Sequence, residues 1–240
     1  MYLYGKNQIK ERIKANPKSI SRIFFRQNSD YSAIKEMAES ADIESSLLDE
    51  KEFGALAKNF NTQGIIAEID SFEYTPLEDL LERPDHDKMN FLILSNITDP
   101  QNLGAILRTA ACFGNLAVII PRHRSAAVNE TVLRVACGAE NYVPVVQVTN
   151  IIPAMEDAKK NGYWTVGSVV EDGDSVLDFK FPFPLCLVIG AEDKGIRKGV
   201  MNNLDFRVSL PMPGKALSLN AAVATAIFCY EITRQSRAGC

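Results

Sequence analysis

The second half of the chain alternates short apolar runs with helical segments, and this alternation restricts the fold more than any other feature. Buried strands separated by helices of about ten residues are typical of a parallel sheet with helices on both faces. A last helix is predicted from about Leu219 to Arg237. We therefore expect an α/β domain over residues 89–240, with strands at 91–97, 116–121, 142–148, 163–170, 184–190 and 206–212 and further helices at 102–113, 128–137 and 151–161.

At 240 residues the chain is long enough for a second, smaller domain, and residues 1–72 have the pattern of one. Residues 73–88 contain two prolines and many acidic residues but little apolar periodicity, which indicates a linker. The predicted organisation is a small α/β domain (1–72), a linker (73–88) and a larger α/β domain (89–240). The small domain combines a basic helix at its start with strands at 21–27 and 64–70 and helices at 31–40 and 49–59.

Basic residues are concentrated at the N-terminus, although the whole chain has a formal net charge of -4. Residues 1–30 contain seven basic and two acidic residues, and contacts to a phosphate backbone depend on clustered Lys and Arg. A solvated helix face is the alternative interpretation of such a charge run. The residues that we predict to contact phosphates are Lys6, Lys10, Arg12, Lys14, Arg22 and Arg26.

Several classes of protein find no support in the sequence. No apolar run approaches the roughly 18 residues of a membrane-spanning helix, and the first residues lack the apolar core of a signal peptide, so we expect a cytoplasmic protein without a membrane partner. Neither His86 nor His123 has a second His or Cys at the spacing of metal ligands, and no metal is expected. Neither GxGxxG nor the P-loop pattern follows a strand, which argues against a Rossmann or P-loop enzyme.

Function must instead be read from three junctions where a predicted strand ends in a loop, because parallel sheets bind ligands at the carboxyl ends of their strands. In the first junction, Asp99 and Pro100 fit a helix entry. Asn102 and Arg108 are six residues apart, and their side chains can line one pocket from the start of that helix. The alternative is that Asn102 caps the helix and Arg108 is a surface cation.

The other two junctions add glycines and polar side chains. After the strand at 184–190, Gly190 allows a cofactor to touch the backbone and Glu192 can accept hydrogen bonds from a ligand. After the strand at 206–212, Ser218 and Asn220 open a helix whose small residues permit close packing. The alternatives are a glycine turn with a solvated glutamate, and a Ser218 that is only the N-cap.

The three junctions read NITDPQNLGAILRTA, VIGAEDKG, and SLPMPG followed by LSLNAAVA. In this order they resemble the three motifs of the SpoU (TrmH) family of the SPOUT superfamily of RNA methyltransferases. The resemblance covers about residues 89–236, and residues 1–72 resemble the family's substrate-binding domain, which has a ribosomal L30e-like fold. With the segment RSAAVNETVLRVACGAENYVPVVQVTN, the layout is most similar to that of enzymes that methylate a guanosine ribose in 23S ribosomal RNA.

The resemblance implies a SPOUT-type parallel sheet with a C-terminal trefoil knot, and a homodimer whose active site takes residues from the subunit interface. The implied partner is structured RNA, above all 23S ribosomal RNA, and the implied cofactor is S-adenosylmethionine. By the same resemblance the cofactor contacts Gly190, Leu210 and Leu219, with Ile189, Pro211 and Met212 nearby. The catalytic positions that match the family's motifs are Asn102, Arg108, Glu192, Ser218 and Asn220.

The implied reaction is a displacement in which a ribose 2′-oxygen attacks the methyl carbon of a sulfonium. A ribose hydroxyl is a weak nucleophile, so the site must polarise its proton and align the reacting atoms. An arginine remains charged at neutral pH, so we expect Arg108 to bind RNA phosphate and stabilise the developing alkoxide. Asn102, Ser218 and Asn220 would orient the ribose and Arg108, and Glu192 would fix this network.

Three alternatives remain open at the level of sequence. The substrate is transfer RNA in the first, and the chain is a non-catalytic RNA-binding factor for ribosome assembly in the second. The complete motif set argues against a non-catalytic role. The third is an α/β enzyme acting on a small molecule, and the basic N-terminal segment argues against it.

Overall fold

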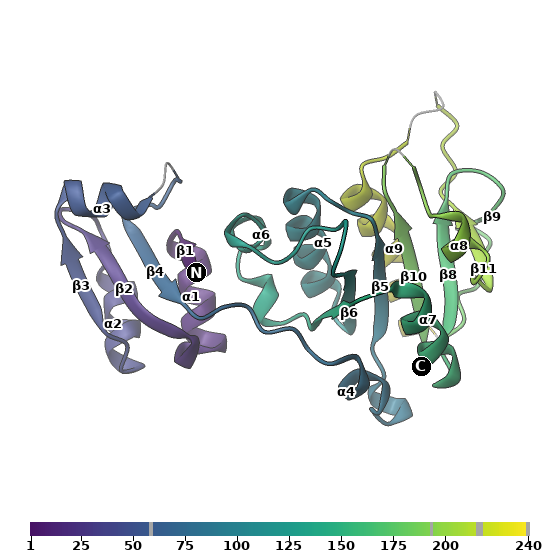
Figure 1. Ribbon diagram of the computed structural model, residues 1–240, viewed down its shortest axis with the longest axis horizontal. Coiled ribbons are helices and arrows are strands. Elements are labelled where there is room, and N and C mark those ends of the chain that lie inside the picture. Colours follow the sequence, from purple (N-terminus) through teal and green to yellow (C-terminus); the bar gives the residue numbers. More distant parts are fainter. Residues whose placement is uncertain (58–59, 193, 215–217, 239–240) are drawn as a thin grey trace. The chain divides into compact units, whose positions relative to one another are not determined.

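The computed structural model describes residues 1–57, 60–192, 194–214 and 218–238 (Figure 1). The predicted end of the helix at 49–59 therefore lies outside the described residues. The chain divides into two compact units, of which the first contains Met1–Glu73 and Val128–Tyr142. The second contains Tyr74–Ala127 and the residues from Val143 onward. No helix in the described residues is long and apolar enough to cross a membrane.

The first unit is built on a mixed four-stranded sheet with the strand order β1-β4-β2-β3. Strand β4 is antiparallel to both of its neighbours, whereas β2 and β3 are parallel. The predicted strands at 21–27 and 64–70 are β2 and β4, while the short strands β1 and β3 were not predicted. The elements are β1 (Tyr2–Tyr4), α1 (Lys6–Ala15), η1 (Pro17–Ser19), β2 (Ile20–Arg26), α2 (Ser32–Ser40), β3 (Ser45–Leu48), α3 (Glu50–Ala57) and β4 (Ile65–Ile69), with α6 (Glu130–Ala136) and η3 (Ala139–Asn141) from the middle of the chain.

The segment 128–142 belongs to the first unit, although it follows the predicted linker in sequence. The backbone N–H of Tyr2 donates to Glu130 Oε1 at 3.0 Å, and Gln8 Nε2 donates to the carbonyl oxygen of Arg134 at 3.1 Å. The hydroxyl of Tyr142 donates to a carboxylate oxygen of Glu11 at 2.9 Å. The predicted helix at 128–137 therefore exists as α6, but it completes the small unit instead of covering the large sheet.

The second unit contains a seven-stranded sheet in which all neighbouring strands are parallel. The strand order is β7-β6-β5-β10-β8-β11-β9, so β10 lies between β5 and β8. This is the arrangement of alternating strands and helices that the sequence indicated. The elements are α4 (Leu77–Leu81), η2 (Asp85–Asp87), β5 (Asn90–Ser95), α5 (Pro100–Phe113), β6 (Leu116–Pro121), β7 (Val145–Val148), α7 (Ile151–Lys160), β8 (Trp164–Val169), β9 (Asp174–Ser175), β10 (Leu185–Gly190), α8 (Lys198–Met201), β11 (Phe206–Ser209) and α9 (Ala221–Ala238).

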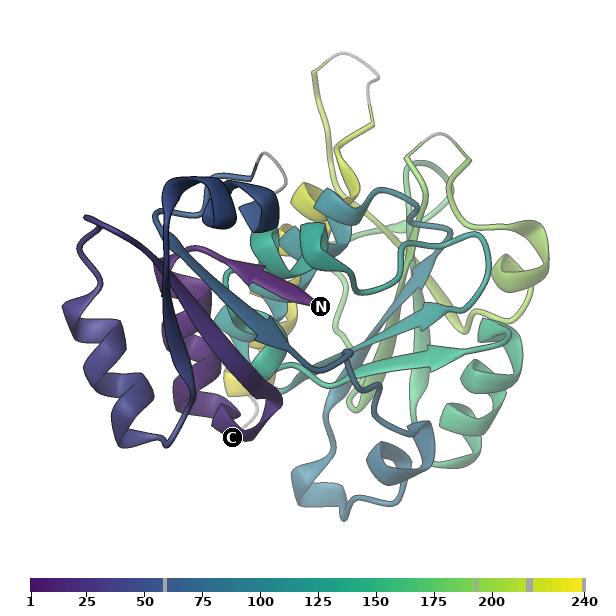
Figure 2. The ribbon, with the colours of Figure 1, turned by 60° about the vertical axis from the view of Figure 1, so that its left-hand side comes forward.

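Helices cover both faces of this sheet (Figures 1 and 2). Helices α4, α7 and α8 contribute buried side chains to one core cluster with β5, β6 and β10, while α5 and α9 pack on each other. The central strands β5 and β10 are buried almost throughout, which explains why both read as continuous apolar runs. The predicted linker is partly structured, because Leu77, Leu80 and Leu81 on α4 are buried in this core.

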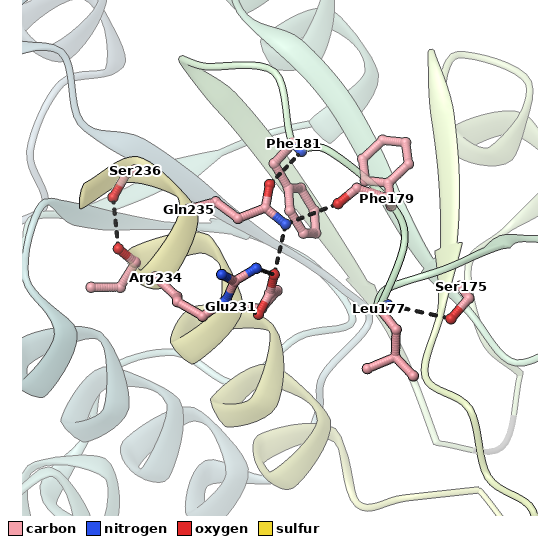
Figure 3. Close-up of polar contacts among 9 residues, drawn as sticks. Ser175, Leu177, Phe179, Phe181, Glu231, Arg234, Gln235 and Ser236 are labelled. Carbon is pink, nitrogen blue, oxygen red and sulfur yellow. Dashed lines mark hydrogen bonds and ion pairs between the residues drawn. The ribbon is translucent and has the colours of Figure 1, made fainter. Parts of the chain in front are cut away.

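The last helix is tied to the segment before β10 by one glutamine side chain (Figure 3). Gln235 on α9 accepts a hydrogen bond from the backbone N–H of Phe181 at 2.8 Å and donates to the carbonyl oxygen of Phe179 at 2.9 Å. Its amide also donates to Glu231, one turn earlier on the same helix, at 2.6 Å. Helix α9 is thereby fixed near its C-terminal end.

Candidate active site

Asn102 lies in the first turn of α5, at the carboxyl edge of the large sheet. The helix begins at Pro100, two residues earlier than predicted, because the side chain of Asp99 caps it by accepting from the N–H of Gln101 at 2.8 Å. Asp99 therefore takes the capping role that was the alternative explanation for Asn102. The side chain of Asn102 is left to contact other parts of the unit.

Three predicted catalytic residues, one from each motif, form a single hydrogen-bond network. Glu192 Oε1 accepts from Asn102 Nδ2 at 3.0 Å and from Asn220 Nδ2 at 2.6 Å. Asn220 Nδ2 also donates to Asn102 Oδ1 at 2.9 Å. The backbone N–H of Ala221 donates to the same glutamate oxygen at 3.1 Å, which places a carboxylate at the N-terminus of α9, where negative charge is favoured.

Asn220 holds a fixed orientation because both ends of its amide have partners. Its Oδ1 accepts from the backbone N–H groups of Ala222 at 3.0 Å and Val223 at 3.3 Å, which makes Asn220 the N-cap of α9. Its Nδ2 donates to the network described above. In the structure Asn220, and not Ser218, is therefore the N-cap of α9, and its amide is directed at Glu192 and Asn102. Ser218 is exposed.

A cavity of about 370 Å³ lies beside this network, at the carboxyl ends of β8 and β10 and at the exit from β11. Pro211 does not belong to the described lining, and its side chain is exposed. Glu192 and Ser218 of the predicted catalytic set also line the cavity. The cofactor positions that the resemblance implied and that do line it are Ile189, Gly190, Leu210, Met212 and Leu219.

Sequence reasoning missed one wall of this cavity, formed by residues 168–171 at the end of β8. The signal was present, because the carboxyl end of any strand next to β10 must face the same edge of the sheet. The neighbour of β10 was not predictable from the strand pattern alone. Glu171 adds a second carboxylate to the lining, and it lies on a different loop from Glu192.

Gly190 is required by the protein's own backbone. A Cβ atom at this position would lie 2.5 Å from the backbone nitrogen of Ile196 and would also clash with Gly195. The loop returns this close because Gly195 N donates to the carbonyl oxygen of Ala191 at 2.8 Å and Gly195 adopts a φ of 58°. The predicted reason for this glycine, contact of a cofactor with the backbone, is therefore incomplete.

Arg108 is on α5, beyond Asn102, and its side chain is exposed. It does not line the cavity among the residues described there. Hydrogen bonds thus join Asn102, Glu192 and Asn220 to one another, and Arg108 is not a member of this network among the residues that the structure describes. Cys112, one turn further along the helix, is exposed as well.

The six basic residues predicted to contact phosphates have different surroundings in the first unit. Arg12 is buried, and its guanidinium faces Glu140 at 3.5 Å, so it is removed from the set that can reach a phosphate. Lys10 is half-buried. The other four form ion pairs with acidic side chains, namely Lys6 with Asp30, Lys14 with Glu11, Arg22 with Glu44 and Arg26 with Glu50.

Comparisons with known proteins agree over nearly the whole chain. The chain is 36% identical over 239 residues to the 23S rRNA (guanosine-2′-O-)-methyltransferase RlmB of Pseudomonas aeruginosa, with 97% of this chain and 96% of that protein covered. The protein of the same name from Neisseria meningitidis is 35% identical over 237 residues, with 97% and 94% covered. The AdoMet complex of the SpoU methyltransferase AviRb from Streptomyces viridochromogenes shares the fold, with a TM-score of 0.81, 24% identity and coverage of 99% and 91%.

Family models match both parts of the chain. The model for RNA 2′-O ribose methyltransferase substrate binding matches residues 2–75. The model of the SpoU rRNA methylase family matches residues 89–230, which include all three junctions. The chain therefore belongs to the SpoU rRNA methylase family.

Proposed function

We propose that this protein transfers the methyl group of S-adenosylmethionine to the ribose 2′-hydroxyl of a guanosine in 23S ribosomal RNA. The observation that carries the proposal is the network of Asn102, Glu192 and Asn220 at the edge of the 370 Å³ cavity. The names of the relatives from Pseudomonas aeruginosa and Neisseria meningitidis support the choice of RNA. Such a substrate implies that the protein acts in the cytoplasm.

The cavity fits the cofactor in size and chemistry. Pockets that bind cofactors have volumes of roughly 300–1,000 Å³ and are lined by apolar groups with a few polar ones. Here Leu210, Met212 and Leu219 supply apolar surface, and Glu171 and Glu192 supply carboxylates for the hydroxyl and ammonium groups of S-adenosylmethionine. When bound, this cofactor supplies an electrophilic methyl group on a sulfonium.

The network orients the polar groups that face the ribose. Asn220 uses its amide to join the start of α9 to Glu192 and Asn102. The three hydrogen bonds to Glu192 all reach Oε1, which sets the direction of Oε2. Ser218 lines the cavity and orients the ribose, while Arg108 binds a neighbouring RNA phosphate and stabilises the alkoxide that develops at the 2′-oxygen.

The active form in this proposal is a homodimer, and Arg108 acts in the site of the partner subunit. Helix α9 carries an exposed apolar stripe of Val223, Ile227 and Tyr230, with exposed fractions of 48%, 41% and 60%. The rings of Tyr230 and Phe113 are 6.4 Å apart, so the stripe adjoins α5, which carries the exposed Arg108. A second copy that covers the stripe would thereby bring its own Arg108 near the first copy's site.

The first unit selects the RNA in this proposal, through Lys6, Lys10, Lys14, Arg22 and Arg26. The match of residues 2–75 to a substrate-binding model supports this role. Because four of the five are paired with surface acids, RNA phosphates would replace weak ion pairs at little cost. We also propose that the C-terminal part of the second unit forms a trefoil knot, as the resemblance to the family implies.

Mapping of ribose methylation tests the proposal. Total RNA from cells with and without the gene is probed for 2′-O-methyl groups, and 23S ribosomal RNA that lacks the modification is then incubated with the pure protein and labelled S-adenosylmethionine. We expect loss of one guanosine methylation in 23S ribosomal RNA and its restoration in vitro. A site in transfer RNA would move the substrate to the alternative class, and absence of any transfer would overturn the proposed activity.

A further inference from the structure

Two connected cavities extend along the carboxyl edge of the large sheet, away from the 370 Å³ cavity. The nearer one has a volume of about 420 Å³ and shares Ala191, Lys194 and Gly195 with the 370 Å³ cavity. Because the 370 Å³ cavity is the proposed binding site of S-adenosylmethionine, we call it the cofactor cavity. The farther one, of about 970 Å³, shares Asn96, Arg124 and Arg197 with the nearer one. The three cavities therefore form one continuous surface within the second unit, which we call the edge groove where it lies outside the cofactor cavity.

The edge groove is basic. Its charged or titratable lining residues are His123, Arg124, Lys194 and Arg197, and no acidic side chain lines it among the residues that the structure describes. Arg124 and Arg197 are exposed, and neither forms an ion pair within the described part of the chain. This contrasts with the first unit, where Lys6, Lys14, Arg22 and Arg26 are paired with acids.

The floor of the groove offers a hydrogen-bond group without a partner. Ser95, at the end of β5, is 0% exposed and lines the larger cavity, and its Oγ has no hydrogen-bond partner among the described residues. A buried hydroxyl without a partner is uncommon and costs free energy. The N-terminus of the ten-residue helix α7 lines the same cavity through residues 149–152, and this end of a helix favours an anion.

The backbone around Arg124 is built to hold this position. Arg124 has a φ angle of 57°, in the left-handed region that an arginine rarely adopts, and Asn96 has a φ of 68°, in the same region, which asparagine tolerates better. The two loops that carry them are joined, because Asn96 Nδ2 donates to the carbonyl oxygen of Arg124 at 3.4 Å and Ala126 N donates to that of Ile97 at 2.8 Å. The strained loop fixes an exposed arginine at the edge of the sheet.

We propose that the edge groove binds the phosphodiester backbone of the substrate RNA next to the methylated nucleotide, with Arg124 and Arg197 holding a phosphate. This inference rests on the proposed function for its ligand. Arginine presents a planar fork that matches phosphate oxygens, and the groove begins where the cofactor cavity ends. A ribose placed for methyl transfer must continue into flanking phosphates, and this groove offers them positive charge and an unpaired hydroxyl.

The test compares two double variants that remove the same charge from neighbouring positions. The groove variant is Arg124→Gln with Arg197→Gln. The control variant is Arg122→Gln with Lys198→Gln, whose side chains are exposed neighbours that do not line the groove among its described residues. Binding of an unmethylated 23S ribosomal RNA transcript is measured over roughly 50–200 mM salt, a range in which phosphate contacts change affinity strongly.

We expect the groove variant to bind the transcript at least about tenfold more weakly than the control and to lose about 1.5 from the slope of log Kd against log salt. Its affinity for S-adenosylmethionine, measured by calorimetry, should stay within about twofold, because neither arginine lines the cofactor cavity. Arg124→Lys with Arg197→Lys keeps the charge and should recover most of the slope. Recovery of the slope separates loss of charge from damage to the loops.

Equal Kd and slope in the groove and control variants would overturn the proposal. A parallel loss of cofactor affinity in the glutamine and lysine variants would overturn it as well, because the arginines would then hold the domain together. The binding readout does not require methyl transfer. If the wild type binds the transcript but never methylates it, the proposed function fails, while the comparison of variants still decides the groove.

Discussion

Arg12 and Glu140 form an ion pair that is buried in the first unit, and burial shifts the pKa values of both side chains. Their side chains are 9% and 0% exposed, and Arg12 Nε and Glu140 Oε2 have no partner among the described residues. Burial raises the pKa of Glu140 and lowers the pKa of Arg12, so the cost of desolvation exceeds the attraction between the two charges. The pair fixes the segment 128–142 to α1 without adding much net stability.

A pair of variants tests this account of Arg12 and Glu140. Arg12→Met alone leaves a buried carboxylate without its cation and should lower the free energy of unfolding by about 3–5 kcal/mol. Arg12→Met with Glu140→Leu removes both charges and should lie within about 1 kcal/mol of the wild type. Urea unfolding measures both. A double variant as unstable as the single one would show that the pair stabilises the fold.

The raised pKa of Glu140 also predicts a pH dependence. The folded state favours the protonated carboxyl, so the contribution of Glu140 to the free energy of unfolding is largest below the ordinary value of 4.5 and falls as the pH rises through the folded-state pKa. Glu140→Gln cannot titrate and should remove this contribution to the decrease above about pH 4.5. Urea unfolding at a series of pH values checks the difference, and identical profiles would contradict it.

At the scale of elements, helix α9 is fixed at both ends by side-chain amides. Asn220 caps its start, and Gln235 joins its last turns to residues 179–181. Both ends matter for the site, because the first turn of α9 presents Asn220 and Ala221 to Glu192. A helix that shifted along its axis would separate Asn220 from Glu192 and Asn102.

Gln235→Ala should therefore destabilise the second unit by about 1–3 kcal/mol, because two backbone groups lose their partner. The neighbouring Arg234→Ala removes only a surface ion pair with Glu231 and should cost less than about 1 kcal/mol. Thermal unfolding compares the two variants. Equal losses would mean that the contacts drawn in Figure 3 do not hold the helix.

The place of the segment 128–142 in the first unit determines which truncated chains should remain soluble. Val132, Leu133 and Ala136 on α6 are at most 1% exposed, and they belong to the first unit. Deletion of residues 1–73 should therefore leave apolar side chains uncovered and produce aggregation. A matched deletion that also replaces 128–142 by a Gly/Ser linker should stay monodisperse in size-exclusion chromatography. If both truncated chains stay equally monodisperse, the apolar side chains of α6 do not need residues 1–73 to cover them.

Across the whole molecule, the elements that follow from the local pattern of apolar and polar residues could be predicted from the sequence. The alternating strands and helices of the second unit, and the polar residues at strand ends, follow from apolar periodicity and from the geometry of parallel sheets. The family matches over residues 2–75 and 89–230 confirm the family that the three motifs indicated. The insertion of β10 between β5 and β8 and the place of α6 depend on contacts between distant segments, which no local pattern encodes.

Mixed dimers test the proposed arrangement of the whole assembly. Arg108→Ala and Glu192→Gln each inactivate a chain, but a dimer of one copy of each has one site with both native residues if Arg108 acts across the interface. Mixing equal amounts, with subunit exchange, should restore about a quarter of wild-type methyl transfer. Activity that stays at the level of the separate variants would place Arg108 in its own chain's site.

We propose that Asn102, Glu192 and Asn220 form the methyl-transfer site beside the cofactor cavity. Asn102 belongs to the network but does not line that cavity among its described residues. The most direct measurement is the single-turnover rate of methyl transfer to unmethylated 23S ribosomal RNA, with S-adenosylmethionine affinity measured on the same samples. For Asn102→Ala we predict a rate about 10–100-fold lower and an affinity within about threefold, while the neighbouring Gln101→Ala stays at the wild-type rate. An Asn102→Ala variant that transfers methyl groups at the wild-type rate would show that this network is not the methyl-transfer site.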